Sequence, residues 1–152
     1  MSTKVGSVAL GRNLMSGLLK GLTMAMGVAC VAIGFLHMAL GIDSVPDMGS
    51  SGVTADSQSR FFGAIFVGYG LAWIWAARRS PIPSVVVRWL AAVFMLGGVG
   101  RLISLAVYGV PHWFQIVLTV LELALPPVFF WLSAEDEKRL VSVGGGRTRV
   151  AD

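Results

Sequence analysis

The sequence predicts an all-α integral membrane protein, a four-transmembrane-helix bundle with both termini in the cytoplasm. The composition predicts the membrane, because 55% of the 152 residues are hydrophobic and only 13% are charged. Soluble domains carry about 25% charged residues, so this chain has too few polar side chains to cover a surface that faces water. The mean hydropathy of +0.76 agrees. The long apolar stretches and the placement of the basic residues then predict the helices and their orientation.

Four apolar stretches are long enough to form membrane spans. A helix needs about 20 mostly apolar residues to cross the hydrocarbon core of a bilayer. Because lipid offers no hydrogen-bond partners, the backbone groups of each stretch must be satisfied within a helix. We therefore expect helices at about 21–42, 60–78, 85–109 and 112–132.

These helices divide the chain into three segments. Residues 20–133 form the four-helix transmembrane domain, residues 1–19 an N-terminal cytoplasmic or interfacial segment, and residues 134–152 a cytoplasmic C-terminal tail. The first helix has a basic flank like that of a signal peptide. Its apolar run is longer than the signal core of about 7–15 residues, so we expect a retained span.

The basic residues predict the orientation. Lys and Arg are enriched in cytoplasmic connections, and in this chain they gather on one side of the expected spans. The other side has only Arg60, at the start of the second helix, and Arg101 lies within the third. Both termini are therefore expected in the cytoplasm. The cytoplasmic set is Lys4, Arg12, Lys20, Arg78, Arg79, Arg88, Lys138, Arg139, Arg147 and Arg149.

Several classes of function do not fit the sequence. The net charge of +4 does not indicate a nucleic-acid partner, because the basic residues lie between apolar spans instead of forming one patch. Cys30 is the only cysteine, which excludes an internal disulfide and a cysteine-based zinc site. The glycine-rich GGVG stretch lies inside a span with no strand before it, so it does not predict a phosphate loop. No cofactor and no metal are expected.

Two charged residues inside the expected spans predict an intramembrane polar site. Arg101 lies in the third helix, and Glu122 is the acidic residue of the fourth. A charged side chain at the centre of a membrane helix costs about 2.5–3.5 kcal/mol, so such residues tend to be paired and functional. The short turn at Gly109–Pro111 makes the two helices antiparallel neighbours and puts both residues at a similar depth. We expect an Arg101–Glu122 ion pair.

Other polar residues share the faces of these helices or approach from the outer side. We expect Asp56 or Ser57 to be the N-cap of the second helix, just before Arg60. Two arginines opposite one intramembrane acid would leave one positive charge for a phosphate, carboxylate or polar headgroup. An arginine or a histidine within a span can also be purely structural, with its hydrogen bonds made inside the protein and no ligand bound. The candidate ligand-binding or polar cluster is Arg101, Glu122, Arg60, Ser104, His37, Thr119, Gln115, Tyr108 and Asp56.

Small residues, prolines and aromatic residues predict how the helices pack. Gly27, Gly34 and Gly41 recur every seven residues, and Gly63 and Gly70 share one face of the second helix. Such small residues let membrane helices approach closely. Gly97 lies on the face of Arg101. Pro126 and Pro127 leave two carbonyls without helical donors, so a kink is expected beside Glu122. Three further residues fit the aromatic belts of membrane proteins, namely Trp73, Trp75 and Trp113.

Several of these features together resemble a known family. The stretches DSQSRFFGAIFVGYGLAWIWAARR and GGVGRLISLAVYGVPHWFQIVLTVLELALPP are similar to the bacterial membrane proteins catalogued as domain of unknown function 4345. The resemblance covers about residues 20–133. It implies a four-helix membrane domain in the inner membrane of a bacterium and no particular activity. The positions that carry it are Asp56, Arg60, Gly100, Arg101, Ser104, Gly109, Pro111 and Glu122.

The sequence leaves three functions open. The first is a small non-catalytic membrane protein, either an accessory subunit of a membrane complex or a binder of a lipid-like or anionic ligand at the Arg101–Glu122 site. The second is an enzyme for a lipid-soluble substrate, with Glu122 or His37 as acid–base. The third is a small transporter, which would need to oligomerise. The expected partners are membrane lipid and either other membrane subunits or further copies of the chain.

Overall fold

The computed structural model describes the backbone of residues 3–47 and 52–147, and the side chains of 14–47 and 52–139. Over these residues the fold is all-helical, and four helices are long and apolar enough to cross a membrane. The predicted all-α class with four apolar spans is confirmed. The elements are α1 (Thr3–Leu40), the short 3₁₀ helix η1 (Gly41–Ser44), α2 (Gly52–Arg78), α3 (Ser84–Tyr108) and α4 (Trp113–Arg147).

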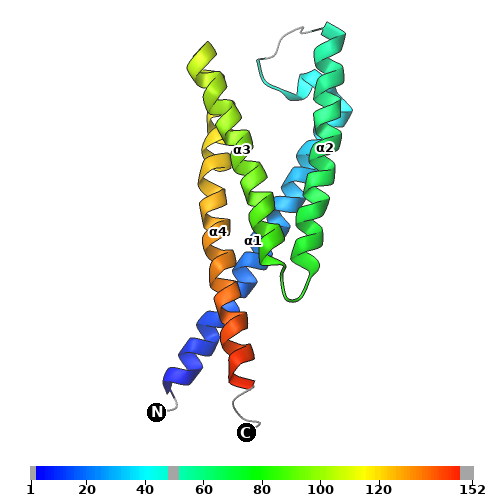
Figure 1. Ribbon diagram of the computed structural model, residues 1–152. Helices are drawn as coiled ribbons and strands as arrows, with labels where there is room; N and C mark the ends of the chain where they lie inside the picture. Colours follow the sequence, from blue (N-terminus) through cyan, green and yellow to red (C-terminus); the bar gives the residue numbers. More distant parts are fainter. Residues whose placement is uncertain (1–2, 48–51, 148–152) are drawn as a thin grey trace.

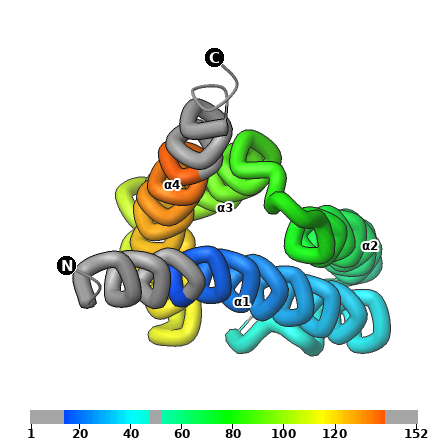
Figure 2. The backbone as a smooth tube through the Cα atoms, turned by 90° about the horizontal axis from the view of Figure 1, so that it is seen from below, coloured from blue at the N-terminus to red at the C-terminus, as the bar shows by residue number. Residues whose placement is uncertain are grey.

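The four helices form two antiparallel pairs, α1 with α2 and α3 with α4 (Figure 1). Both termini and the α2–α3 connection lie at one end of the molecule, which we call the terminal end. η1 and the α3–α4 turn lie at the opposite, distal end, where the two pairs separate. Figure 2 shows that α1 is tilted, so that its turns from residue 14 onward lie beside α4 and its C-terminal part lies beside α2.

Three helices extend beyond their predicted bounds. α1 begins at Thr3, so most of the predicted N-terminal segment is continuous with the first span. α2 begins at Gly52 instead of residue 60, because the polar run before Arg60 is already helical. α4 continues through both prolines to Arg147 and includes most of the predicted C-terminal tail. Residues 148–152 of that tail lie outside the described part of the chain.

The buried core lies in the terminal half of the molecule, where the two pairs meet. Trp73 of α2 is 0% exposed, and its ring centroid lies 4.7 Å from that of Phe129 on α4. The Tyr69 hydroxyl of α2 donates a hydrogen bond of 2.5 Å to the carbonyl of Leu90 on α3. The prediction that Trp73 belongs to an aromatic belt is therefore wrong, because its indole fills the junction between the pairs.

Glycines bring α1 and α2 into backbone contact, as their spacing predicts. A Cβ atom added to Gly70 would lie 2.7 Å from the carbonyl oxygen of Gly27. One added to Gly63 would lie 2.8 Å from the carbonyl oxygen of Gly34. No side chain fits at these distances, so both positions require glycine. The two contacts are separated by seven residues on each helix and form what we call the glycine ladder.

Candidate functional site

The predicted ion pair between the third and fourth helices is present. Arg101 Nε of α3 donates to Glu122 Oε2 of α4 over 2.8 Å. The Glu122 side chain is 10% exposed and that of Arg101 is 36% exposed. The carboxylate is therefore enclosed, while a good part of the arginine lies on the surface of the helix pair. Both residues lie inside apolar helices, so this ion pair lies within the predicted spans.

A second residue of α4 also holds Arg101. Its Nη1 atom donates to the side-chain carbonyl of Gln115, and the Thr119 hydroxyl donates to the Gln115 backbone carbonyl over 2.8 Å. A guanidinium carries five N–H groups, and these two hydrogen bonds use two of them. The other three N–H groups of Arg101 have no acceptor among the described residues. Arg101 is thus fixed in position and still has donors available.

Two glycines of α3 make room for this arrangement. A Cβ atom at Gly98 would lie 2.9 Å from Leu123 Cδ2 and 3.0 Å from Glu122 Cβ. A Cβ atom at Gly97 would lie 3.5 Å from Glu122 Oε2, an ordinary contact distance. Gly98 is therefore the glycine that lets α4 pack tightly. Gly97 leaves space in front of the carboxylate.

Two prolines follow the enclosed carboxylate along α4. Pro126 and Pro127 remain inside α4 and follow Glu122 by four and five residues. A proline has no N–H to donate to the carbonyl four residues before it, so the carbonyls of Glu122 and Leu123 lose their usual helical donors. The site therefore combines free arginine donors with backbone acceptors.

A second ion pair lies at the distal end of the α1–α2 pair. Arg60 Nε donates to Asp56 Oδ2 over 2.9 Å, one helical turn away. Arg60 Nη1 also donates to the backbone carbonyls of Met38 (2.5 Å) and Ala39 (3.1 Å). The last carbonyls of a helix have no partner within that helix. Arg60 therefore satisfies the C-terminal end of α1.

Asp56 binds the segment that follows α1. Its Oδ1 atom accepts a hydrogen bond of 3.1 Å from the backbone N–H of Ile42, and the Ser59 hydroxyl donates to the Gly41 carbonyl over 3.0 Å. Gly41 has a φ of +59°, a conformation that suits glycine. The predicted N-cap role of Asp56 is wrong, because this residue lies inside α2 and faces α1 and η1.

The two arginines belong to different sites. Arg60 is bound within the α1–α2 pair and Arg101 within the α3–α4 pair, each with its own carboxylate. We expected the two arginines to share a single acid, with one positive charge left over. That expectation is wrong, because Arg60 pairs with Asp56, which the charge count left out. The spacing of Asp56 and Arg60, four residues apart in a helix, is the signal that indicates this pairing.

The remaining predicted residues stand apart from both pairs. His37 Nδ1 lies 2.9 Å from the Ile33 carbonyl of its own helix, and its Cβ packs against Gly63. Ser104 and Tyr108 are exposed on α3, and no hydrogen bond of their hydroxyls is found within the described side chains. Among those side chains, no three His, Cys, Asp or Glu residues form a group that could hold a metal ion.

These observations define the class of the chain: four apolar helices in two pairs indicate a multi-pass membrane protein. Residues 18–133 match the family described as Domain of unknown function (DUF4345), and the chain belongs to this family. No curated protein and no solved structure matches the chain significantly. The matched range contains both ion pairs and the glycine ladder, so these features lie within the family domain.

Proposed function

We propose that this chain is a non-catalytic protein of the bacterial inner membrane that binds a lipid-like molecule at Arg101. One observation carries the proposal: Arg101 is held by Glu122 and Gln115 but keeps three N–H donors without a described acceptor. Inside a bilayer no water satisfies such donors, and unsatisfied polar groups there are costly. A molecule that supplies acceptor oxygens at this depth would remove the cost.

The chemistry of the site favours a ligand that has an oxygen-rich headgroup and is otherwise apolar. Glu122 neutralises the charge of Arg101, so the ligand needs acceptors more than it needs a full negative charge. Carboxylate and phosphate oxygens suit the planar fork of a guanidinium, and a carbonyl or hydroxyl oxygen suits a single N–H. Because the α4 side chains already orient Arg101, little conformational entropy is lost when the ligand binds.

The enzyme alternative has less support. It requires Glu122 or His37 to act as the acid–base, within hydrogen-bond reach of the proton that it moves. His37 is instead bonded to its own helix in the α1–α2 pair, while Glu122 is bonded to Arg101 in the other pair. Glu122 serves binding better than catalysis, because its role is to hold the arginine.

The proposal is tested by identifying what copurifies with the full chain from native membrane. The wild-type protein and the Arg101→Gln/Glu122→Gln variant are purified in mild detergent, and bound molecules are identified by mass spectrometry. Both new side chains are neutral, so neither leaves an unpaired charge in the membrane. We expect a lipid-like molecule with the wild type, reduced at least about tenfold in the variant, since hydrogen bonds to a charged group contribute about 1.5–3 kcal/mol each.

The matched control is Asp56→Asn/Arg60→Gln, which neutralises the other arginine–carboxylate pair. This control should retain the molecule at the wild-type level. Equal loss from both variants would contradict the proposal, because the molecule would then depend on the fold and not on Arg101. Copurification of a partner protein without any lipid-like molecule would favour the accessory-subunit hypothesis instead.

A further inference from the structure

A groove on the outer face of α2 combines apolar, aromatic and cationic side chains. Its lining residues are Leu71, Ile74, Trp75, Arg78 and Arg79, and its volume is about 360 Å³. These positions form a single stripe of the helix, since residues three and four apart share a face. The stripe changes in chemistry along the helix, from aliphatic inside the span to aromatic and then to two arginines at the terminal end.

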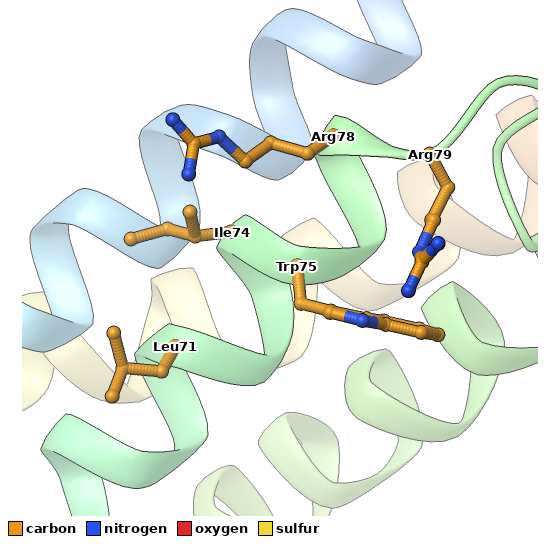
Figure 3. Close-up of a pocket in the computed structure, with 5 residues that line it drawn as sticks. All are labelled: Leu71, Ile74, Trp75, Arg78 and Arg79. Carbon is orange, nitrogen blue, oxygen red and sulfur yellow. The ribbon is translucent and has the colours of Figure 1, made fainter.

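The two arginines lie on different sides of the groove. Figure 3 shows Arg78 directed toward α1 and Arg79 folded over the ring of Trp75. The guanidinium carbon of Arg79 lies 4.7 Å from the centroid of that ring. Trp75 is 47% exposed, so its indole lies open on the surface beneath the arginine. The aromatic contact orients Arg79 and leaves its N–H groups free to bind an anion.

The charges of these arginines are not balanced within the described residues. Two cations of α3 and α4 at the same end have carboxylate partners: Arg88 pairs with Glu137 over 2.7 Å and Lys138 with Glu135 over 2.8 Å. Arg78 and Arg79 have no ion pair and no side-chain hydrogen bond within the part of the chain that is described. Two neighbouring cations are therefore exposed at the end of an apolar helix.

A second groove provides an internal comparison. It is lined by Val85, Arg88, Trp89, Ala92 and Phe130 and also places an arginine beside an exposed tryptophan. There Arg88 already donates a hydrogen bond to the carboxylate of Glu137. The α2 groove has similar chemistry, but within the described residues no carboxylate pairs with its two arginines.

We propose that the α2 groove binds the phosphate group of an anionic phospholipid. Arg78 and Arg79 contact the phosphate, Trp75 lies at the level of the glycerol backbone, and Leu71 and Ile74 contact an acyl chain. The order of these side chains along α2 follows the order of headgroup, interface and tail in a lipid. The predicted orientation puts this end at the cytoplasmic leaflet, whose negative surface potential comes from anionic lipids.

The test is native mass spectrometry of the full chain in detergent with equal amounts of phosphatidylglycerol and phosphatidylcholine. We expect the wild type to retain phosphatidylglycerol preferentially. In Arg78→Gln/Arg79→Gln the preference should fall by about fivefold for each arginine removed. In Arg78→Lys/Arg79→Lys it should stay between these two values, because the charges remain while the planar fork is lost.

The matched control is Arg88→Gln/Lys138→Gln, which removes two charges at the same end from residues that already have partners. It should keep the wild-type preference. An unchanged preference in the Arg78→Gln/Arg79→Gln variant, or an equal loss in the control, would overturn the proposal. So would a wild-type protein that does not distinguish the two lipids.

A separate measurement distinguishes a lipid from a free phosphate. Inorganic phosphate is added at millimolar concentration to the wild type loaded with phosphatidylglycerol. Retention of the lipid supports the proposal, because the apolar stripe then contributes to binding. Displacement of the lipid, with phosphate alone raising the unfolding temperature of the wild type, overturns it in favour of a general anion site.

Discussion

The two helix pairs are held together by the same kinds of residue used in different ways. In α1–α2, the glycine ladder brings the backbones into contact, and the Asp56–Arg60 pair binds the distal end of α1. In α3–α4, the buried glycine Gly98 permits close packing, and the Arg101–Glu122 pair lies within the apolar span. At a helix end, the arginine of such a pair also donates hydrogen bonds to backbone carbonyls. Within a span, the arginine keeps N–H donors without a described acceptor.

The largest expected effect comes from Glu122→Leu. This change leaves Arg101 as an unpaired charge within the span, which costs about 2.5–3.5 kcal/mol. Unfolding of the purified protein in detergent with increasing denaturant measures the loss. Adding Arg101→Met to this variant should recover most of it, because both charges are then gone. If the double variant is as unstable as the single one, Glu122 stabilises the pair through packing and not through its charge.

The next effect concerns the glycine ladder. Gly70→Ala places a Cβ atom 2.7 Å from a backbone oxygen of α1, and the helices must move apart. Overpacking of this kind costs about 1–3 kcal/mol. The control is Gly68→Ala on the same helix, where a Cβ atom would have nothing within 4 Å. It should change the free energy of unfolding by less than about 0.5 kcal/mol. Equal effects at the two positions would show that the ladder is not the contact that holds α1 to α2.

The smallest expected effect is that of Asp56→Ala at the distal end. It removes the acceptor of the Ile42 N–H and the partner of Arg60, both of which lie near the surface. We expect faster hydrogen exchange of the Ile42 amide, with a smaller loss of thermal stability than in Gly70→Ala. Asp43→Ala, an exposed acid on η1, is the matched control and should leave this exchange unchanged. Unchanged exchange in Asp56→Ala would mean that Arg60 holds the end of α1 without it.

The sequence was sufficient to predict features that depend on periodicity and on the cost of charge in a bilayer. Four spans follow from apolar length, and the Arg101–Glu122 pair follows from matched depth across a short turn. The glycine faces of α1 and α2 follow from the seven-residue spacing of glycines in the sequence. These predictions succeed because each depends on spacing within one helix or across one connection.

Features that depend on contact between distant segments were not predictable in the same way. The polar run before Arg60 was interpreted as a cap, because polar residues are expected outside a span. In the structure Asp56 is helical and faces a turn of α1 and η1 that lies 14 residues earlier in the chain. Trp73 was assigned to a belt from its residue type, whereas its burial depends on Phe129 of another helix pair. Periodicity gives the face of a helix but not the neighbour of that face.

The repeat in the glycine ladder creates an ambiguity that Asp56 removes. Because the contacts recur every seven residues on both helices, α2 could slide along α1 by one repeat and still set glycine against glycine. Such a slide moves a side chain by about 10 Å at the helical rise of 1.5 Å per residue. The slide that sets Gly63 against Gly27 would take Asp56 from Gly41 to Gly34, and its carboxylate would leave Ile42 for the apolar span. The opposite slide, which sets Gly63 against Gly41, would also separate Asp56 from Ile42. The acid thus selects one alignment among several that the glycines alone would accept.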